Sequence, residues 1–255
     1  MITCEHMQIY STMQRGIFLL FCIFSTLHSV EKISVIIPCH YSHFYLLHDL
    51  IEAYANQTLI PHEIVISLSE SNQIPAPDIT AFKTKKWPFK VLLLSNVQKL
   101  TAALNRKMAA KASTGDLILF QDADDLPHPK RVEIVKHIFE HNRIHHLVHS
   151  FTPEGSEFPD YSVESTPLIK TTFDLLIGGI PSEESIIPLQ HGHICVTRPV
   201  IMNAFWKPEN EPGEDIHFNI ATMRRFMGSC YVTPMRLVLF RGSLSFFSNT
   251  PPELR

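Results

Sequence analysis

The chain has 255 residues, of which 45% are hydrophobic and 18% charged. This composition excludes a disordered protein, and the length suffices for one large domain, or two small ones, with a substantial core. The 22 basic and 25 acidic residues give a net charge of −3, which argues against a nucleic-acid partner. The five cysteines are far apart and form no C-x-x-C pair, so the sequence predicts neither a disulfide framework nor a zinc finger.

The first 30 residues have the layout of a secretory signal or a membrane anchor. Arg15 precedes an apolar run over residues 17–27, and small residues lie in and after its end. The run is shorter than the roughly 20 residues that a spanning helix needs, which leaves a cleaved signal, a short or interfacial anchor and a mis-set start before Met13 open. We favour a leader over residues 1–30, with membrane association through residues 16–27, over an additional core segment. The location stays open between secretory, membrane-associated and cytoplasmic.

After the leader, strand-like and helix-like segments alternate, which is typical of an α/β domain with a mainly parallel sheet. Residues 33–37 (ISVII) are expected to form a strand buried on both faces and stopped by Pro38, and residues 43–55 a helix. Further strands of the first half are expected at residues 63–67, 90–94 and 116–120, and a further helix at residues 100–112.

The second half is less clearly patterned. A helix is expected over residues 129–141, loops with short elements over 152–188, and a last strand at 237–240. Glu214 and Asp215 begin a further helix, with acids in its first turn as the helix dipole favours. The apolar stripe of that helix comprises Ile216, Ile220, Met223 and Met227.

Three carboxylates, Asp122, Asp124 and Asp125, follow the strand expected at residues 116–120. The carboxyl ends of strands are where an open α/β sheet binds its ligands. The mutual repulsion of three carboxylates is costly unless water or a cation offsets it, and Mg²⁺ or Mn²⁺ is usually held by one or two carboxylates plus phosphate oxygens. The triplet therefore favours a metal–diphosphate site over a solvated turn that begins the next helix.

Six short motifs occur in the order found in family 2 glycosyltransferases of the GT-A fold. They are residues 33–38 (ISVIIP), 56–58 (NQT), 102–105 (AALN), 115–120 (GDLILF), 122–125 (DADD) and 213–215 (GED). The chain resembles this family from about residue 31 to residue 245. The resemblance implies a single GT-A domain over residues 31–255, an α/β fold with a Rossmann-like, mainly parallel central sheet flanked by helices.

The resemblance also implies an activity, namely transfer of a sugar from a nucleoside diphosphate donor, with a UDP-sugar favoured, to a hydroxyl group of a glycan, protein or lipid. The family usually inverts the anomeric carbon. By resemblance, Asp215 is the general base and Glu214 orients the acceptor, although helix capping would also explain both acids. Asp124 would bind Mn²⁺ or Mg²⁺ directly, Asp122 would face the ribose or a metal-bound water, and Asp125 would support the loop.

The expected donor-binding residues are completed by Pro38, Ser69, Glu70 and Asn105. The family usually carries an Asp pair after the second strand, but Leu68 and Ser69 stand in those positions. Glu70, or Ser69 with backbone groups, is expected to hold the base instead. Arg106 is either a diphosphate contact or part of an exposed helix face. The Gln-x-x-Arg-Trp motif of processive synthases is absent from the sequence, which favours addition of a single sugar.

Several alternatives remain open. His191 and His193 precede a strand-like segment and are either metal ligands or substrate contacts or, more simply, structural hydrogen-bonding groups. A zinc site at His137, His141 and His145 is disfavoured because no acid or Cys completes it. A catalytically inactive relative that binds a nucleotide or glycan is the main rival. A haloacid-dehalogenase-type phosphatase is a weaker one, because Leu126 stands where that motif needs Thr or Val.

Overall fold

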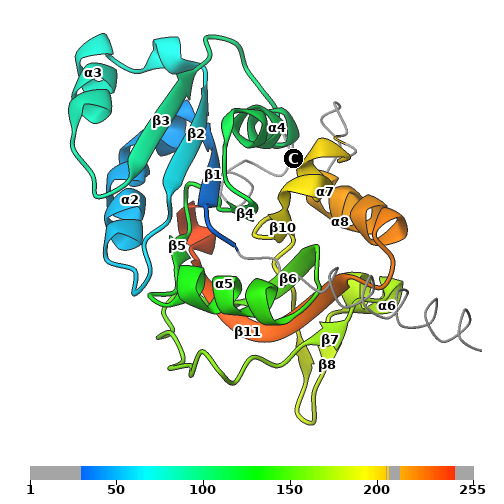
Figure 1. Ribbon diagram of the computed structural model, residues 1–255. Helices are drawn as coiled ribbons and strands as arrows, with labels where there is room; N and C mark the ends of the chain where they lie inside the picture. The colour runs from blue at the N-terminus through cyan, green and yellow to red at the C-terminus, as the bar shows by residue number, and fades with distance from the viewer. Residues whose placement is uncertain (1–29, 205, 207–212, 245–255) are drawn as a thin grey trace, which may run out of the picture.

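A computed structural model describes residues 30–204, 206 and 213–244 (Figure 1). Apart from its last residue, the leader expected over residues 1–30 lies outside the described residues. In the part of the chain that is described, no helix combines the length and apolar character needed to cross a membrane.

Within the described residues, nine strands form one mixed sheet and two more form a small hairpin. The first half of the chain contributes β1 (Ile33–His40), β2 (Glu63–Ser69), β3 (Lys90–Ser95) and β4 (Leu117–Phe120). The second half contributes β5 (Leu126–Pro127), β6 (His146–Pro153), β7 (Ile169–Lys170), β10 (Cys195–Thr197) and β11 (Cys230–Phe240). The hairpin consists of β8 (Ile180–Pro181) and β9 (Ile186–Ile187).

The strand order is β3-β2-β1-β4-β10-β6-β11-β5, with β7 paired to β11. The first four strands are parallel to one another, as the alternating pattern predicts. Strand β10 then runs antiparallel to both β4 and β6, and β11 runs parallel to β6. The carboxyl end of β4 therefore lies beside the segment that leads into β10.

Helices cover both faces of the sheet (Figure 1). They are α2 (Leu47–Ala55), α3 (Ala76–Thr84), α4 (Ala102–Ala112), α5 (Arg131–His141), α6 (Phe173–Gly178), α7 (Arg198–Met202) and α8 (Glu214–Arg225), with short 3-10 helices at Tyr41–Leu46, Ser71–Gln73 and Gly242–Leu244. Side chains of one strand alternate between the faces, so Val35 packs with α2 and α5, and Ile36 packs with α4, α7 and α8. The mixed α/β sheet with helices on both sides confirms the expected fold class.

Strand β1 does not stop before Pro38 but continues to His40. Its pairing with β4 ends at Ile36, whose carbonyl accepts a hydrogen bond from the Gln121 N–H at 3.0 Å, while its pairing with β2 continues to His40. Alternate residues of a strand direct their backbone groups to the same neighbour. The N–H that Pro38 lacks would thus point to the side on which β4 has already ended, and the proline costs the sheet no hydrogen bond.

The buried side of α8 differs from the stripe expected from its apolar residues. Met227 is 82% exposed. The fully buried positions of the helix are Phe218, Asn219 and Thr222. Asn219 is buried because it hydrogen-bonds with His146 of β6, at 2.7 Å, and with His191. Such a polar contact leaves no trace in a hydrophobic pattern.

Candidate active site

The acidic loop after β4 lies at the carboxyl end of the parallel half of the sheet and is fixed by several hydrogen bonds. The Gln121 side-chain amide donates to the backbone carbonyls of Asp122, at 3.0 Å, and Asp125, at 3.2 Å. The Arg241 N–H at the end of β11 donates to Asp125 Oδ1 at 2.8 Å, and the Arg241 side chain donates to the Asp124 carbonyl. The carboxylates therefore project from a braced loop rather than from a loose turn.

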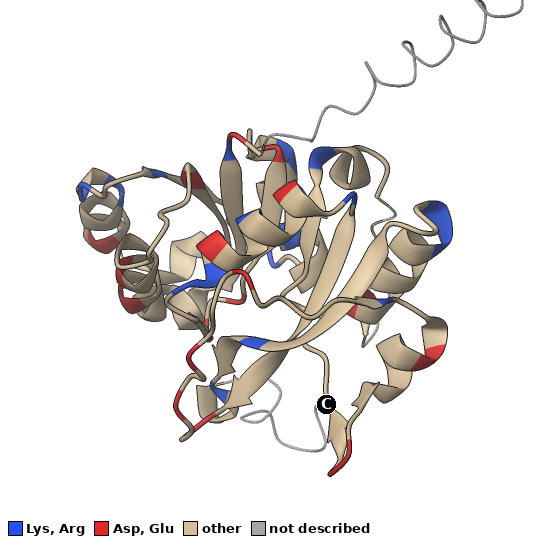
Figure 2. Ribbon diagram, turned by 60° about the horizontal axis from the view of Figure 1, so that its bottom comes forward, with Lys and Arg blue, Asp and Glu red and all other residues tan. Residues whose placement is uncertain are grey.

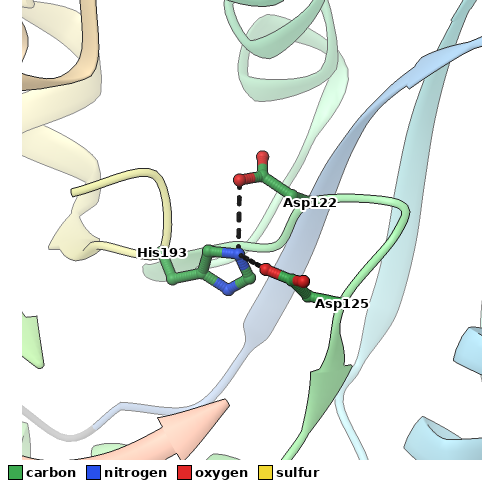
Figure 3. Close-up of side chains that lie close together, drawn as sticks. All are labelled: Asp122, Asp125 and His193. Carbon is green, nitrogen blue, oxygen red and sulfur yellow. Dashed lines mark ion pairs between the residues drawn. The ribbon is translucent and has the colours of Figure 1, made fainter. Parts of the chain in front are cut away.

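Asp122, Asp125 and His193 form a compact cluster, shown in Figure 3. His193, from the segment before β10, is completely buried. Its Nε2 lies 3.0 Å from Asp125 Oδ2 and 3.3 Å from Asp122 Oδ2, and its Nδ1 has no hydrogen-bond partner among the described residues. We refer to these three residues as the DDH cluster. Asp124 is not a member of it.

The DDH cluster suits a divalent cation. Its ligand atoms, two carboxylate oxygens and one imidazole nitrogen, lie within 4.8 Å of one another. Neighbouring ligands in an octahedral shell of about 2.1 Å radius are about 3 Å apart, which is close to the nitrogen–oxygen separations found. Oxygen and imidazole ligands together suit Mn²⁺. The residues present thus fit the kind of ion that the sequence predicts.

The pKa values show an excess of negative charge at the loop. Burial and the charges of Asp122 and Asp125 raise the pKa of the Asp124 carboxyl to about 7. Burial alone would also raise the pKa of Asp122, but the charges of Arg106 and His193 outweigh it and hold that pKa well below its usual range. Burial lowers the pKa of His193, yet the two carboxylates reverse this and the net shift is upward. A bound cation would relieve the repulsion around Asp124.

Arg106 joins the DDH cluster to the start of α8. Basic and acidic residues are spread over many elements of the fold (Figure 2), but Arg106 on α4 is only 8% exposed. Its Nη2 donates to Asp122 Oδ1 and its Nη1 to Glu214 Oε1, both at 2.8 Å. Gly192 permits this contact, because a Cβ there would lie 2.6 Å from Asp122 Oδ2 and 3.1 Å from Arg106 Nη2. One guanidinium therefore holds two carboxylates that are far apart in the sequence.

On the α8 side, the chain enters the helix at Gly213, whose φ of 80° is a conformation that favours glycine. Asp215 lies in the first turn of α8, where its Oδ1 accepts a hydrogen bond from the Ile216 N–H at 2.8 Å, and the helix has no side-chain cap at Gly213. Burial lowers the pKa of Arg106, but the charge of Asp122 and, after it, that of Asp215 outweigh burial and raise it. Burial lowers the pKa of His191, and the charge of Asp215 offsets only part of this shift.

A chain of side chains ties His191 to the sheet. The Asn219 amide nitrogen lies 3.3 Å from the His191 carbonyl oxygen and 3.1 Å from His191 Nδ1. A carbonyl only accepts, so the nitrogen assignment is settled, and His191 Nδ1 accepts as well. The Asn219 oxygen accepts from His146 Nε2 at 2.7 Å. His191 is thereby fixed in one tautomer and one orientation.

One pocket lies on the α8 side of Arg106, and no member of the DDH cluster lines it. Its lining includes Arg106, Glu214, Asp215 and His191 on the polar side. Its apolar walls are the rings of Phe120, Trp206 and Phe218. A ligand pocket typically combines an apolar wall with a few polar groups, which here are two carboxylates and the buried Arg106 guanidinium.

The residues expected to bind the donor lie at the ends of β1 and β2. Ser69 is fully buried, with an Oγ that has no partner among the described residues. Glu70 is, in the described part of the chain, the one non-glycine residue with a positive φ, at 52°, and its Oε2 lies 2.9 Å from His40 Nε2. Such strained residues concentrate at functional sites. Pro38 lies in β1 opposite Ser67.

Asn105 occupies a different environment. Its side-chain oxygen accepts a hydrogen bond from Ser67 Oγ at 2.8 Å, and the residue is only 3% exposed. It joins α4 to β2 beneath the site. His137 and His141 stack on each other on α5, and no group of three possible metal ligands other than the DDH cluster occurs in the described ranges.

Sequence reasoning assigned Asp125 a supporting role, left His193 as one of several alternatives and did not consider His40. The signal for His193 was its place just before a strand, but nothing in the sequence shows that this strand pairs with β4. Arg106 stands beside Lys107, and only the contacts distinguish the two. His40 was missed, and the roles of His193 and Arg106 were left open, because their contacts depend on pairings between distant segments.

The sequence model described as glycosyl transferase family 2 matches residues 34–203. A search of curated proteins finds no significant match. Similar solved structures include S. aureus TarS 1-349, with a TM-score of 0.60 and 16% identity over 83% of this chain and 60% of that one. The TarS fragment in complex with UDP-GlcNAc gives a TM-score of 0.59 at 17% identity, over 82% of this chain and 58% of that one.

Another similar structure is the mannosyltransferase PcManGT from Pyrobaculum calidifontis in complex with GDP-Man and Mn²⁺. Its TM-score is 0.59 at 16% identity, and the match covers 82% of this chain and 56% of that one. At these identities the comparisons establish a shared fold. The chain spans about 60% of the length of the TarS fragment.

Proposed function

The chain belongs to glycosyl transferase family 2, and we propose on that basis that it transfers a sugar from a nucleoside diphosphate donor to an acceptor hydroxyl, with inversion and with the help of a divalent cation. The observation that carries the proposal is the Arg106 bridge. It holds Asp122 of the DDH cluster and Glu214 of α8 in one buried network. This bridge supports a site in which the DDH cluster would hold the diphosphate through a cation and the start of α8 would handle the proton.

The cation, Mn²⁺ or Mg²⁺, would be held by Asp122, Asp125 and His193, with the Asp124 carboxylate as a further ligand. When bound, the ion acts as a Lewis acid that stabilises the negative charge of the departing diphosphate. This assignment keeps Asp122 and Asp124, which the sequence predicts as metal-side residues, and adds the two other members of the DDH cluster. The upward pKa shift of Asp124 supports it, because burial and the charges of Asp122 and Asp125 cause that shift and a bound cation would offset it.

Asp215 removes the proton from the acceptor hydroxyl as the hydroxyl attacks the anomeric carbon. Glu214, held by Arg106 at 2.8 Å, orients the acceptor through its remaining oxygen. A base on the α8 side and a leaving group on the side of the DDH cluster suit a single displacement. A single displacement inverts the anomeric carbon.

The donor base would be read at the ends of β1 and β2. Ser69 Oγ and the Glu70 carboxylate, which His40 orients, take the place of the acids that the family usually has after the second strand. Pro38 shapes the β1 end of this region, and Asn105 supports the β2 end through Ser67. Two similar structures hold UDP-GlcNAc and GDP-Man, which supports a nucleotide-sugar donor, and a UDP-sugar is favoured.

The first test is binding and turnover by the full chain. UDP- and GDP-sugars are screened by thermal shift with and without MnCl₂, and release of the nucleoside diphosphate is measured. We expect a nucleotide sugar to raise the melting temperature only when the metal is present, since a ligand at 100 times its Kd stabilises by about 2.7 kcal/mol. Binding without turnover would instead support a catalytically inactive relative, and failure to bind any nucleotide would reject both.

A further inference from the structure

We propose that the pocket beside Asp215 takes a sugar ring, which stacks on the indole of Trp206. The inference rests on the proposed function, because it names the group that this pocket of the same site would bind. The ring belongs either to the donor or to the terminal unit of a glycan acceptor.

The apolar wall of the pocket consists of three rings that brace one another. Trp206 lies nearly parallel to Phe120, with ring centroids 6.1 Å apart and an interplanar angle of 24°. Its centroid lies 4.9 Å from that of Phe218. Phe120 and Phe218 are almost completely buried, whereas Trp206 is partly exposed. The two buried rings thus hold the indole in place and leave part of it free to meet a ligand.

The position of these rings ties the wall to the chemistry. Phe120 is the last residue of β4 and directly precedes the acidic loop, and Phe218 lies one turn after Glu214 on α8. Each buried ring therefore belongs to an element that also carries acids of the site. A ligand that stacks on Trp206 is therefore positioned by β4 and by α8.

The polar side of the pocket selects the chemistry of the occupant. Arg106, His191, Glu214 and Asp215 line it together with the rings. A sugar ring has an apolar C–H face that can lie on an indole and hydroxyl groups around its rim that can donate to carboxylates. An aliphatic lipid chain would cover these charged groups without offering them hydrogen bonds, which is costly. A free phosphate would meet the carboxylates of Glu214 and Asp215 with the same sign of charge.

The pocket is small and open on one side. Its enclosed part has a volume of about 20 Å³, and the wider space of about 320 Å³ between its walls includes the part open to solvent. A sugar ring would therefore lie at the open mouth, with one face on the exposed part of the indole.

The chain has two tryptophans, which gives a direct readout. Trp87 lies between α3 and β3, with Lys85 Nζ 4.2 Å from its ring centroid, and lines a different pocket. The substitution Trp87→Phe leaves Trp206 as the sole tryptophan, whose emission can be excited selectively over that of the six tyrosines. We expect the emission of this variant to change on titration with UDP-GlcNAc or GDP-mannose plus Mn²⁺, or with methyl glycosides of the same sugars. A response to none of these compounds would overturn the inference.

A second experiment separates the two sources of the ring. Trp206→Ala should weaken binding of the sugar about tenfold, which corresponds to about 1.4 kcal/mol, whereas Trp206→Tyr should keep most of the affinity. If the donor supplies the ring, the Kd of the nucleotide sugar rises and that of the nucleoside diphosphate does not. If an acceptor supplies it, the KM of the sugar acceptor rises while hydrolysis of the donor is unchanged.

Trp87→Ala is the matched control and should change neither quantity. Equal binding and equal KM in Trp206→Ala, at an unchanged melting temperature, would reject the stacking role. The proposed function has its own failure, which is the absence of nucleotide binding by the wild-type chain. In that event the methyl glycosides still report whether the pocket binds a sugar.

Discussion

The two sides of Arg106 are built differently. The DDH cluster lies on the loop after β4 and on the segment before β10, at neighbouring positions of one sheet. The opposite side, with Glu214 and Asp215, consists of a helix start and an aromatic pocket. We infer that the strand ends fix the groups that hold charge, whereas the helix start and loop carry the groups that must adapt to a substrate.

Two buried histidines show the same difference in their electrostatics. Burial lowers the pKa of both. At His193 two carboxylates outweigh burial, and the net pKa is raised. At His146 the hydrogen bond with neutral Asn219 does not outweigh burial, and the pKa falls to about 4. At these two positions, the cluster side stabilises positive charge and the α8 side keeps its histidine neutral. His149, which also lies near the DDH cluster, has a lowered pKa because of burial and the charge of Arg131.

The largest expected effect comes from Asp215→Asn, which removes the proposed base and keeps the shape of the side chain. Transfer should fall by about 10²- to 10⁴-fold, the usual contribution of general acid–base catalysis. The Kd of the nucleotide sugar should stay within about twofold. Turnover is measured as nucleoside diphosphate release, and binding by calorimetry.

Asp49→Asn is the control for Asp215→Asn. Asp49 also lies in the first turn of a helix, α2, but far from the pocket in a 73% exposed position. Both substitutions should remove about 0.3–1 kcal/mol of dipole stabilisation. Full transfer activity in Asp215→Asn would leave the interaction with the helix dipole as the only role of this acid.

The second effect is on stability. Arg106→Met leaves the carboxylates of Asp122 and Glu214 without their shared partner, and we expect the free energy of unfolding to fall by about 3 kcal/mol. Arg106→Lys, which keeps the charge but loses the two-pronged contact, should lie in between. Urea unfolding measures both. Lys111→Met, at an exposed position of the same helix, should have little effect, and an equal loss there would contradict the bridging role of Arg106.

The regular half of the fold could be predicted from the sequence. Continuous apolar runs identified β1 to β4 to within three residues, because a strand buried on both faces shows its limits locally. Strand β11 was expected only from residue 237, yet it begins at Cys230. Its pairing with β6 contains register shifts between Thr233 and Arg236 and between Arg236 and Leu239. Irregular pairing of this kind interrupts the hydrophobic alternation on which strand prediction depends.

The site was predictable where it lies next to a regular element. Asp122 after β4 and Asp215 at the start of α8 both stand where a local pattern placed them. The connection between them could not be predicted, because Arg106 is separated from Glu214 by 108 positions. Nor could the sequence show that the short strand β10 brings His193 to the carboxyl end of β4. A buried ion pair leaves no hydrophobic signal, and its partners become known only with the topology.

The third prediction compares two histidines that are two residues apart. His193→Gln removes the nitrogen of the DDH cluster and should weaken Mn²⁺ binding about 10- to 100-fold, as measured by calorimetry or by Mn²⁺ paramagnetic resonance. His191→Gln, on the α8 side, should leave the affinity unchanged. Asp124→Asn tests the assignment made from the sequence. A greater loss in Asp124→Asn than in His193→Gln would place the ion at Asp124 rather than in the DDH cluster.

The smallest effect is a dependence of stability on pH that arises on the α8 side. The pKa of His146 is about 4 in the folded chain, against 6.5 for an unperturbed histidine. The unfolded chain therefore binds more protons between these values, so stability is complete above pH 6.5 and is lost as the pH falls toward 4. His146 alone should lower the free energy of unfolding by about 2 kcal/mol between pH 7.5 and pH 5.

Urea unfolding at the two pH values measures this loss of stability. His146→Gln, which can still donate to Asn219, should reduce the loss. His62→Gln, at an exposed position, should leave it unchanged. His149 offers the sharpest challenge, because burial and the charge of Arg131 lower its pKa as well. If His146→Gln leaves the pH dependence intact and His149→Gln removes it, the acid-sensitive contact lies beside the DDH cluster rather than at the anchor of α8. The electrostatic contrast between the two sides would then be wrong.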